Sequence, residues 1–402
     1  MTLEKTLKNP LKEVAVLGQS IWYDGLVSRE EFDRMILQDD LRGATTNPII
    51  FEKALMKNKQ SAQKASYARR DDESVVITTP RRSLPVRQAG NDADEVFSAD
   101  CADEEIYKSL AVDAVQEVAD VFLPVYQRTL GHDGYVSIEV SPLLAYDTEA
   151  TLREARELFK RVDRPNVMIK IPATAPGIPA IQTAISEGIN VNITLIFSVT
   201  RYREVMEAYI SGLEIRLKSG QPIQKVASVA SFFVSRVDTA VDKILAEKIL
   251  ASKDSAQTAF FGDLLGKVAI ANSKVAYAEF EEIFTQERFR TLKSQGAQMQ
   301  RPLWASTGTK NPAYRDVLYV ESLIGPNTVN TVPPATLEAF RDHGKVSETL
   351  AEGLQEAKNT LAKLASAQIV LLEITEKLEK DGVHLFNEAY LKIIEHIKEK
   401  RA

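Results

Sequence analysis

A lysine stands in the middle of an apolar stretch, Val-Met-Ile-Lys-Ile at 167–171. Side chains alternate between the two faces of a β-strand, so Lys170 shares a face with Met168, and the β-branched residues take the other. Burial inside a protein disfavours the charged form of a lysine, and a neutral amine can attack a carbonyl to form a Schiff base. The residue type and its place in a strand therefore predict a nucleophilic lysine.

Two further apolar stretches carry polar side chains in the same alternation. In Val-Ser-Ile-Glu-Val and Asn-Ile-Thr-Leu-Ile, the polar face holds Glu139, Asn192 and Thr194, and we expect Leu195 on the opposite face. A carboxyl group beside a nucleophilic amine can transfer protons. The structural alternative is a buried salt bridge between Lys170 and Glu139. The nearby amide and hydroxyl groups, which a salt bridge does not need, favour chemistry.

The elements that must position these side chains are eight strand-like stretches, most of them separated by helical patterns. They lie at 17–25, 41–48, 135–142, 166–174, 189–198, 225–233, 301–308 and 327–334. Between 147 and 162, for example, Leu152, Ala155, Leu158 and Val162 recur at helical spacing. This alternation predicts an α/β fold, a (β/α)8 TIM barrel with additional N- and C-terminal helices. An open doubly wound sheet is the alternative, but no Gly-x-Gly-x-x-Gly turn supports it.

Barrel enzymes carry their chemistry at the carboxyl ends of the strands. Four of the other strand-like stretches end in polar residues, namely Asp24, Asn47, Ser231 and Ser306. We expect these side chains to join Lys170 at one face of the barrel. Asp-Gly and Asn-Pro are also typical of turns, so a purely structural role for the first two is the alternative.

Composition excludes several classes of function. The chain has 402 residues with 50 basic and 56 acidic side chains, a net charge of −6, which gives no reason to expect nucleic-acid binding. One cysteine and four scattered histidines indicate neither a disulfide nor a metal site. No apolar stretch reaches the length of a membrane span or a signal peptide. We expect a cytoplasmic protein; a plastid protein whose transit peptide has been removed would have the same features.

We expect residues 1–402 to form a single barrel domain with two segments outside the β/α pattern. Residues 60–100 have no clear period and five arginines, and they predict a disordered segment or a loop insertion. Residues 345–402 are rich in Lys and Glu at helical spacing and predict a C-terminal helical extension packed on the barrel. No feature of the sequence identifies an oligomeric partner.

Six motifs, in order along the chain, resemble the transaldolase family in its longer bacterial and plant subgroup. They are ATTNPIIFEKAL, VSIEVSP, VMIKIPAT, NVNITLIFS, SFFVSRVD and LIGPNTVNTVPPATLEAF. The resemblance runs from about residue 10 to the C-terminus and lapses over roughly 60–100. It implies an enzyme of the non-oxidative pentose phosphate pathway without metal or cofactor. Such an enzyme transfers a dihydroxyacetone unit from sedoheptulose 7-phosphate or fructose 6-phosphate to an aldose phosphate.

The resemblance also implies roles for individual residues. Lys170 would form the Schiff base, and Asp24 would take the proton from the C4 hydroxyl as the carbon–carbon bond breaks. Glu139 would act as acid and base through a water that Thr194 holds. Asn47 and Asn192 would bind the hydroxyls of the three-carbon unit.

The substrate phosphate would lie near Ser231 and Arg236, where a guanidinium fits phosphate geometry, with Ser306 and Lys310 completing the site. Arg236 on the solvated face of a helix is the alternative. Fructose-6-phosphate aldolase, a close relative, has glutamine and tyrosine where this chain has Glu139 and Phe233, so both residues favour a transaldolase. A catalytically inactive scaffold is a further alternative, against which the intact acids and lysine argue.

The end of the chain offers a candidate lid. Phe386 lies in the C-terminal extension, and in the family a late aromatic residue can approach the mouth of the active site. A helix that packs only on the side of the barrel is the alternative.

Overall fold

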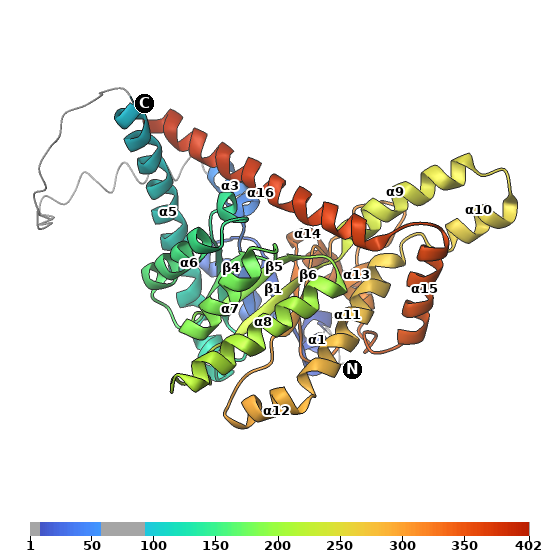
Figure 1. Ribbon diagram of the computed structural model, residues 1–402, viewed down its shortest axis with the longest axis horizontal. Coiled ribbons are helices and arrows are strands. Elements are labelled where there is room, and N and C mark those ends of the chain that lie inside the picture. The colour runs from blue at the N-terminus through green and yellow to red at the C-terminus, as the bar shows by residue number, and fades with distance from the viewer. Residues whose placement is uncertain (1–8, 58–92, 402) are drawn as a thin grey trace, which may run out of the picture.

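The structure is a computed structural model that describes residues 9–57 and 93–401 (Figure 1). Eight parallel strands pair in chain order, and β8 pairs with β1 to close a barrel. The strands are β1 (Gln19–Asp24), β2 (Gly43–Thr45), β3 (Tyr135–Glu139), β4 (Val167–Pro172), β5 (Val191–Ile196), β6 (Ser228–Phe233), β7 (Arg301–Ala305) and β8 (Thr328–Val332). Each predicted strand-like stretch holds one of them, so the predicted (β/α)8 barrel is confirmed.

Helices surround the barrel. They are α1 (Pro10–Val16), α2 (Arg29–Asp39), α3 (Pro48–Lys57), α5 (Ala93–Arg128), the 3-10 turn η1 (Pro142–Leu144), α6 (Thr148–Val162), α7 (Gly177–Glu187), α8 (Val199–Lys218), α9 (Ser235–Ala251), α10 (Ser255–Gly262), α11 (Val268–Phe284), α12 (Glu287–Ser294), α13 (Leu318–Ser322), α14 (Pro334–His343), α15 (Leu354–Ser366) and α16 (Leu371–Arg401). The helix predicted around 147–162 is α6, which Asp147 caps by accepting a hydrogen bond from Ala150 N. None of the helices that the structure describes is long and apolar enough to cross a lipid bilayer.

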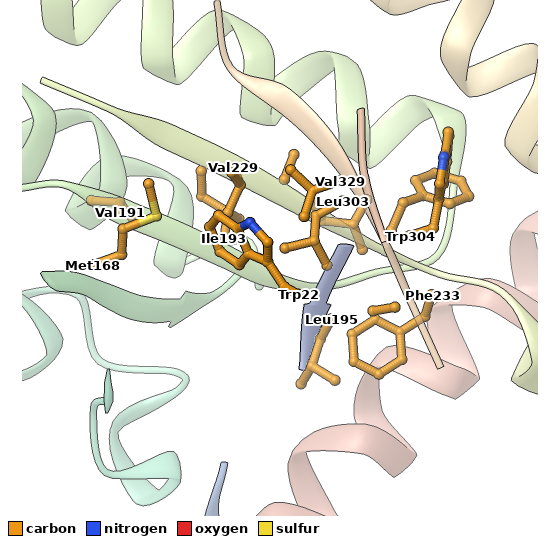
Figure 2. Close-up of a cluster of buried hydrophobic side chains, with 14 of the residues drawn as sticks. Trp22, Met168, Val191, Ile193, Leu195, Val229, Phe233, Leu303, Trp304 and Val329 are labelled. Carbon is orange, nitrogen blue, oxygen red and sulfur yellow. The ribbon is translucent and has the colours of Figure 1, made fainter. Parts of the chain in front are cut away.

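Apolar side chains from several strands form a buried cluster, part of which is shown in Figure 2. Trp22, Met168, Val229, Leu303 and Val329 are at most 1% exposed and belong to this cluster. Met168 has the same strand parity as Lys170, and the register pairs Val229 with Asn192 and Val329 with Leu303. An apolar interior of this kind leaves the carboxyl ends of the strands as the place where polar side chains can gather.

The strand alternation breaks in β5. The pairing of β5 with β6 shifts between Ile193 and Ile196, and Leu195 has a left-handed φ of 60°. Because an extra residue in a strand reverses the side-chain alternation that follows it, Leu195 does not continue the outward face of Ile193. Its side chain instead meets α16, where a Cβ on Gly382 would lie 2.8 Å from Leu195 Cδ2. The prediction that Leu195 shares the outward face of Ile193 is therefore wrong.

Most of the segment predicted to be a loop or disordered, 60–92, lies outside the described residues. The backbone of residues 93–100 is helical and forms the beginning of α5. In the C-terminal extension, 344–353 is not helical, and the helix break falls at 367–370, where Gln368 has a φ of 57° that ends α15.

Helix α16 crosses the barrel mouth from α15 to the N-terminal end of α5 (Figure 1). It contacts α3, α5, α9 and β5, and Arg401 at its end lies 3.2 Å from Asp103 of α5. Its buried face includes Val383, Phe386 and Tyr390, which recur at helical spacing. The C-terminal extension therefore covers the end of the barrel at which the strands terminate.

Candidate active site

A cavity of about 440 Å³ opens at the carboxyl ends of the strands. Nine of the eleven predicted site residues line it: Asp24, Asn47, Lys170, Thr194, Ser231, Phe233, Arg236, Ser306 and Lys310. The two others, Glu139 and Asn192, lie behind this wall and contact residues of it. The structure thus brings all eleven to one place, although they come from seven different strands and the turns that follow them.

Lys170 is 5% exposed and points into this cavity. Its Nζ donates a hydrogen bond to Thr46 O at 3.3 Å and lies 3.5 Å from Glu139 Oε2. Strand pairing explains the arrangement, because Glu139 and Asn192 are the direct partners of Lys170 on the two neighbouring strands. Residues paired across parallel strands point to the same side of the sheet.

Glu139 is held in an environment that disfavours its charge. Its side chain is 5% exposed, and burial raises its pKa from 4.5 to about 7, although the charge of Lys170 acts in the opposite direction. Glu139 Oε2 and Thr194 Oγ1 are buried polar atoms without a hydrogen-bond partner among the described residues. Buried polar atoms are normally satisfied by protein or by water, so both atoms are suited to hold a water molecule or a substrate group.

Asp24 lies at the end of β1 on the same cavity. Burial raises its pKa, and the positive charge of Lys170 and a hydrogen bond from Thr45 counteract the increase. That bond runs from Thr45 Oγ1 to Asp24 Oδ1 at 3.0 Å, and Thr331 Oγ1 lies 2.8 Å from the same threonine oxygen. The carboxylate therefore has a fixed orientation and an increased affinity for a proton.

The two asparagines make different contacts. Asn192 is fully buried, and its amide donates to Ser137 Oγ at 2.9 Å and accepts from Ser231 Oγ at 2.7 Å. Asn47 lines the cavity, and its Oδ1 accepts from Ile50 N at 3.0 Å at the start of α3. Asn47 therefore caps a helix, and binding of substrate hydroxyls by either amide stays a prediction.

One wall of the cavity is cationic. Arg236, in the first turn of α9, is half-buried, and its Cζ lies 5.8 Å from the Phe233 ring centroid. Burial lowers the pKa of Arg236, although the charge of Asp381 acts in the opposite direction. Neither Arg236 nor Lys310 forms an ion pair with a residue that the structure describes. Ser306 shares a hydrogen bond of 3.0 Å with Ser235 at the start of α9. Arg236 and Lys310, neither of them ion-paired within the described part of the chain, lie with the Ser306 hydroxyl on one cavity and form a suitable site for an anion.

Several lining residues were missed by the sequence analysis, among them Tyr23, Thr45, Lys53 and Thr331. Thr45 could have been found, because it precedes Asn47 by two residues and so has the same strand parity. Lys53 is in the ATTNPIIFEKAL motif, but on a helix whose orientation the motif does not reveal. Burial, with nearby carboxylates, raises the pKa of Tyr23 to about 12, so its hydroxyl is neutral.

Phe386 closes the cavity from the side of α16. It lines the cavity, is 3% exposed, and its ring centroid lies 5.8 Å from Lys170 Nζ. An edge-on aromatic contact joins this helix to α5, where the ring centroids of Tyr390 and Tyr107 lie 5.1 Å apart. Tyr107 in turn makes an edge-on contact with Phe51 of α3, at 6.1 Å. The aromatic residue is thus fixed above the predicted nucleophile.

Comparison with known proteins agrees with this geometry. A family model described as Transaldolase/Fructose-6-phosphate aldolase matches residues 21–397. The chain is 41% identical over 398 residues to Transaldolase of Trichodesmium erythraeum, a match covering 98% of this chain and 97% of that protein. It is 42% identical over 400 residues to Transaldolase of Saccharopolyspora erythraea, covering 98% of each. It is also 42% identical over 395 residues to Transaldolase of Mycolicibacterium smegmatis, covering 96% of each.

Proposed function

The chain belongs to the transaldolase/fructose-6-phosphate aldolase family, and we propose that it acts as a transaldolase in which Lys170 carries the transferred unit. The reaction moves a dihydroxyacetone unit from a ketose phosphate to an aldose phosphate. The observation that carries the proposal is the position of Lys170 Nζ. It faces the cavity, 3.5 Å from a carboxyl group whose pKa is about 7.

The first step is Schiff-base formation. The Lys170 amine attacks the C2 carbonyl of the ketose phosphate, and loss of water from the resulting carbinolamine forms the imine. Glu139 supplies the proton that the departing hydroxyl needs and takes back the proton released by the amine. Its pKa near neutrality lets it act in both directions at physiological pH. The unsatisfied Glu139 Oε2 and Thr194 Oγ1 support proton transfer through a water held between them.

The second step breaks the carbon–carbon bond. Asp24 removes the proton of the C4 hydroxyl, the C3–C4 bond breaks, and its electron pair moves into the iminium as an enamine on Lys170. The aldose phosphate then leaves. An acceptor aldehyde takes its place, the enamine carbon attacks it, and Asp24 returns the proton to the new hydroxyl. The raised pKa of Asp24 makes it a stronger base than an exposed aspartate.

The cationic wall gives the substrate its orientation. Arg236 and Lys310 bind the phosphate, and Ser306 donates a hydrogen bond to it. Because these residues follow β6 and β7, and Lys170 is on β4, the phosphate and the reacting carbonyl lie on different sides of the cavity. An extended sugar phosphate can place its phosphate on one side and its carbonyl on the other.

Helix α16 favours transfer over hydrolysis. With Phe386 above Lys170, water has restricted access to the enamine until the acceptor arrives. Protonation of the enamine carbon and hydrolysis of the resulting imine would instead release free dihydroxyacetone, which is the reaction of an aldolase.

Trapping of the Schiff base tests the proposal. Reduction with borohydride in the presence of fructose 6-phosphate should add a three-carbon unit to Lys170, which peptide mass mapping locates. Lys170→Arg should abolish the adduct and the transfer activity, because a guanidinium stays protonated. Lys53→Arg is the matched control, since Lys53 lines the same cavity, and it should keep the adduct. An adduct on any other lysine would refute the assignment.

A further inference from the structure

The loop that carries Lys310 is tied to the helix that carries Arg236. Tyr314, four residues after Lys310, donates a hydrogen bond from its hydroxyl to Asp242 Oδ2 at 2.7 Å. Asp242 belongs to α9 and lies six residues after Arg236. The other oxygen of this carboxylate accepts from Gly266 N at 3.0 Å, so both ends of the acid are held.

The neighbouring acid on α9 makes the same kind of contact. Asp238 Oδ2 accepts from the hydroxyl of Tyr319 at 3.0 Å, and its Oδ1 accepts from Ala269 N at 2.7 Å. Asp238 and Asp242 are four residues apart and so share one face of the helix. This face is bonded to two tyrosines of the segment after β7.

The loop itself is closed by its own hydrogen bonds. Thr309 Oγ1 donates to Arg315 O at 2.8 Å, Ala313 N donates to Asn311 Oδ1 at 3.0 Å, and Tyr314 N donates to Asn311 O at 3.1 Å. Lys310 therefore projects from a compact turn. Tyr314 forms the base of this turn, so its contact with α9 sets the position of the whole turn.

Position 266, which packs against the Tyr314 ring, requires a glycine. Gly266 has a φ of +68°, and a Cβ at this position would lie 2.7 Å from Tyr314 Cζ. The segment between α10 and α11 thus closes over the ring and holds its hydroxyl toward Asp242. Three segments far apart in the sequence fix one hydrogen bond beside the cationic wall.

We propose that Tyr314 and Asp242 are positioning residues that hold Lys310 beside Arg236 for recognition of the substrate phosphate. Neither residue lines the cavity, so both act through the cations rather than by contact with the substrate. The inference rests on the proposed function of Arg236 and Lys310 as phosphate ligands. It adds the reason why an exposed lysine on a surface loop has a defined place in the site.

Inhibition by inorganic phosphate tests the proposal in the full-length protein. Tyr314→Phe removes the hydroxyl and leaves the ring. It should raise the inhibition constant of phosphate and the KM of fructose 6-phosphate by roughly 3- to 10-fold, which corresponds to one lost hydrogen bond. The kcat should change little. Tyr277→Phe is the matched control, because its hydroxyl bonds Pro326 O at 3.2 Å, before the start of β8 and thus away from the cavity. It should leave both constants unchanged.

A double variant separates positioning from general stability. In a Lys310→Ala background, the effect of Tyr314→Phe on phosphate inhibition should disappear. An undiminished effect there, or an unchanged constant in Tyr314→Phe alone, would overturn the positioning role. If Lys310→Ala and Arg236→Ala both leave phosphate inhibition unchanged, the proposed phosphate site itself is refuted, and the positioning role with it. Melting temperatures of the variants show whether they are folded.

Discussion

Replacement of Glu139 by glutamine is the change that tests the site most directly. The amide has nearly the same size as the carboxyl group, so the packing around it should persist. It cannot exchange protons, however, and it removes the negative charge 3.5 Å from Lys170 Nζ. The proposal predicts that Glu139→Gln forms and hydrolyses the Schiff base slowly.

The raised pKa gives Glu139 both an acid and a base form at neutral pH. A glutamic acid with a pKa of 4.5 is about 0.3% protonated at pH 7, and one with a pKa of about 7 is about half protonated. Burial thus increases the population of the acid form at neutrality by roughly 150-fold, while about half of the molecules keep the base form. Loss of a positioned acid and base costs about 100- to 10,000-fold in rate. We expect Glu139→Gln to fall in this range.

Rapid mixing with fructose 6-phosphate, followed by a borohydride quench at successive times, measures the rate of adduct formation at Lys170. The wild-type rate should change with an inflection near pH 7, because Glu139 titrates there. Glu139→Gln should be slow and lack this inflection. A wild-type rate and pH profile in the variant would refute the acid–base role and leave Glu139 as the partner in a structural salt bridge.

Stability gives an independent check, with a definite sign. The folded-state pKa of Glu139 lies above its value in the unfolded chain, so the folded state holds the extra proton between about pH 4.5 and 7. The wild type therefore loses stability as the pH rises through this window. Glu139→Gln does not titrate there. Its melting temperature relative to that of the wild type should rise from pH 4.5 to pH 7, and a constant difference would contradict the raised pKa.

Three further predictions concern the rest of the site. Asp24→Asn should trap its Schiff base at the normal rate but release glyceraldehyde 3-phosphate about 100- to 10,000-fold more slowly, and equal losses in both steps would contradict the division of roles. Arg236→Ala should weaken the binding of phosphorylated substrates by about 10- to 100-fold and should change the binding of unphosphorylated fructose little. An equal loss of affinity for both kinds of substrate would place Arg236 in the scaffold. Phe386→Ala should increase release of free dihydroxyacetone relative to transfer, whereas its neighbour Leu385, which is 41% exposed, should tolerate alanine without a change in this ratio. The same ratio in both variants would leave α16 with a structural role only.

Local sequence signals identified the barrel and most of its site. Strand and helix periods depend only on neighbouring residues, so eight strand-like stretches with helical patterns between them were sufficient to predict a closed parallel barrel. The place of Lys170 within an apolar strand followed from the same alternation. Because parallel strands end on one face, polar residues at strand ends such as Asp24 and Ser306 could be assigned to a common site before any contact was known.

Other features were decided by tertiary structure. Leu195 departs from the alternation because a bulge, which depends on the register with β6, reverses its direction toward α16. Phe386 lies above Lys170 only because a helix more than 200 residues further along the chain crosses the mouth of the barrel. The pKa of Glu139 depends on how completely its surroundings exclude water. Burial, register and contacts between distant segments arise when the chain folds, so a pattern of neighbouring residues carries no direct record of them.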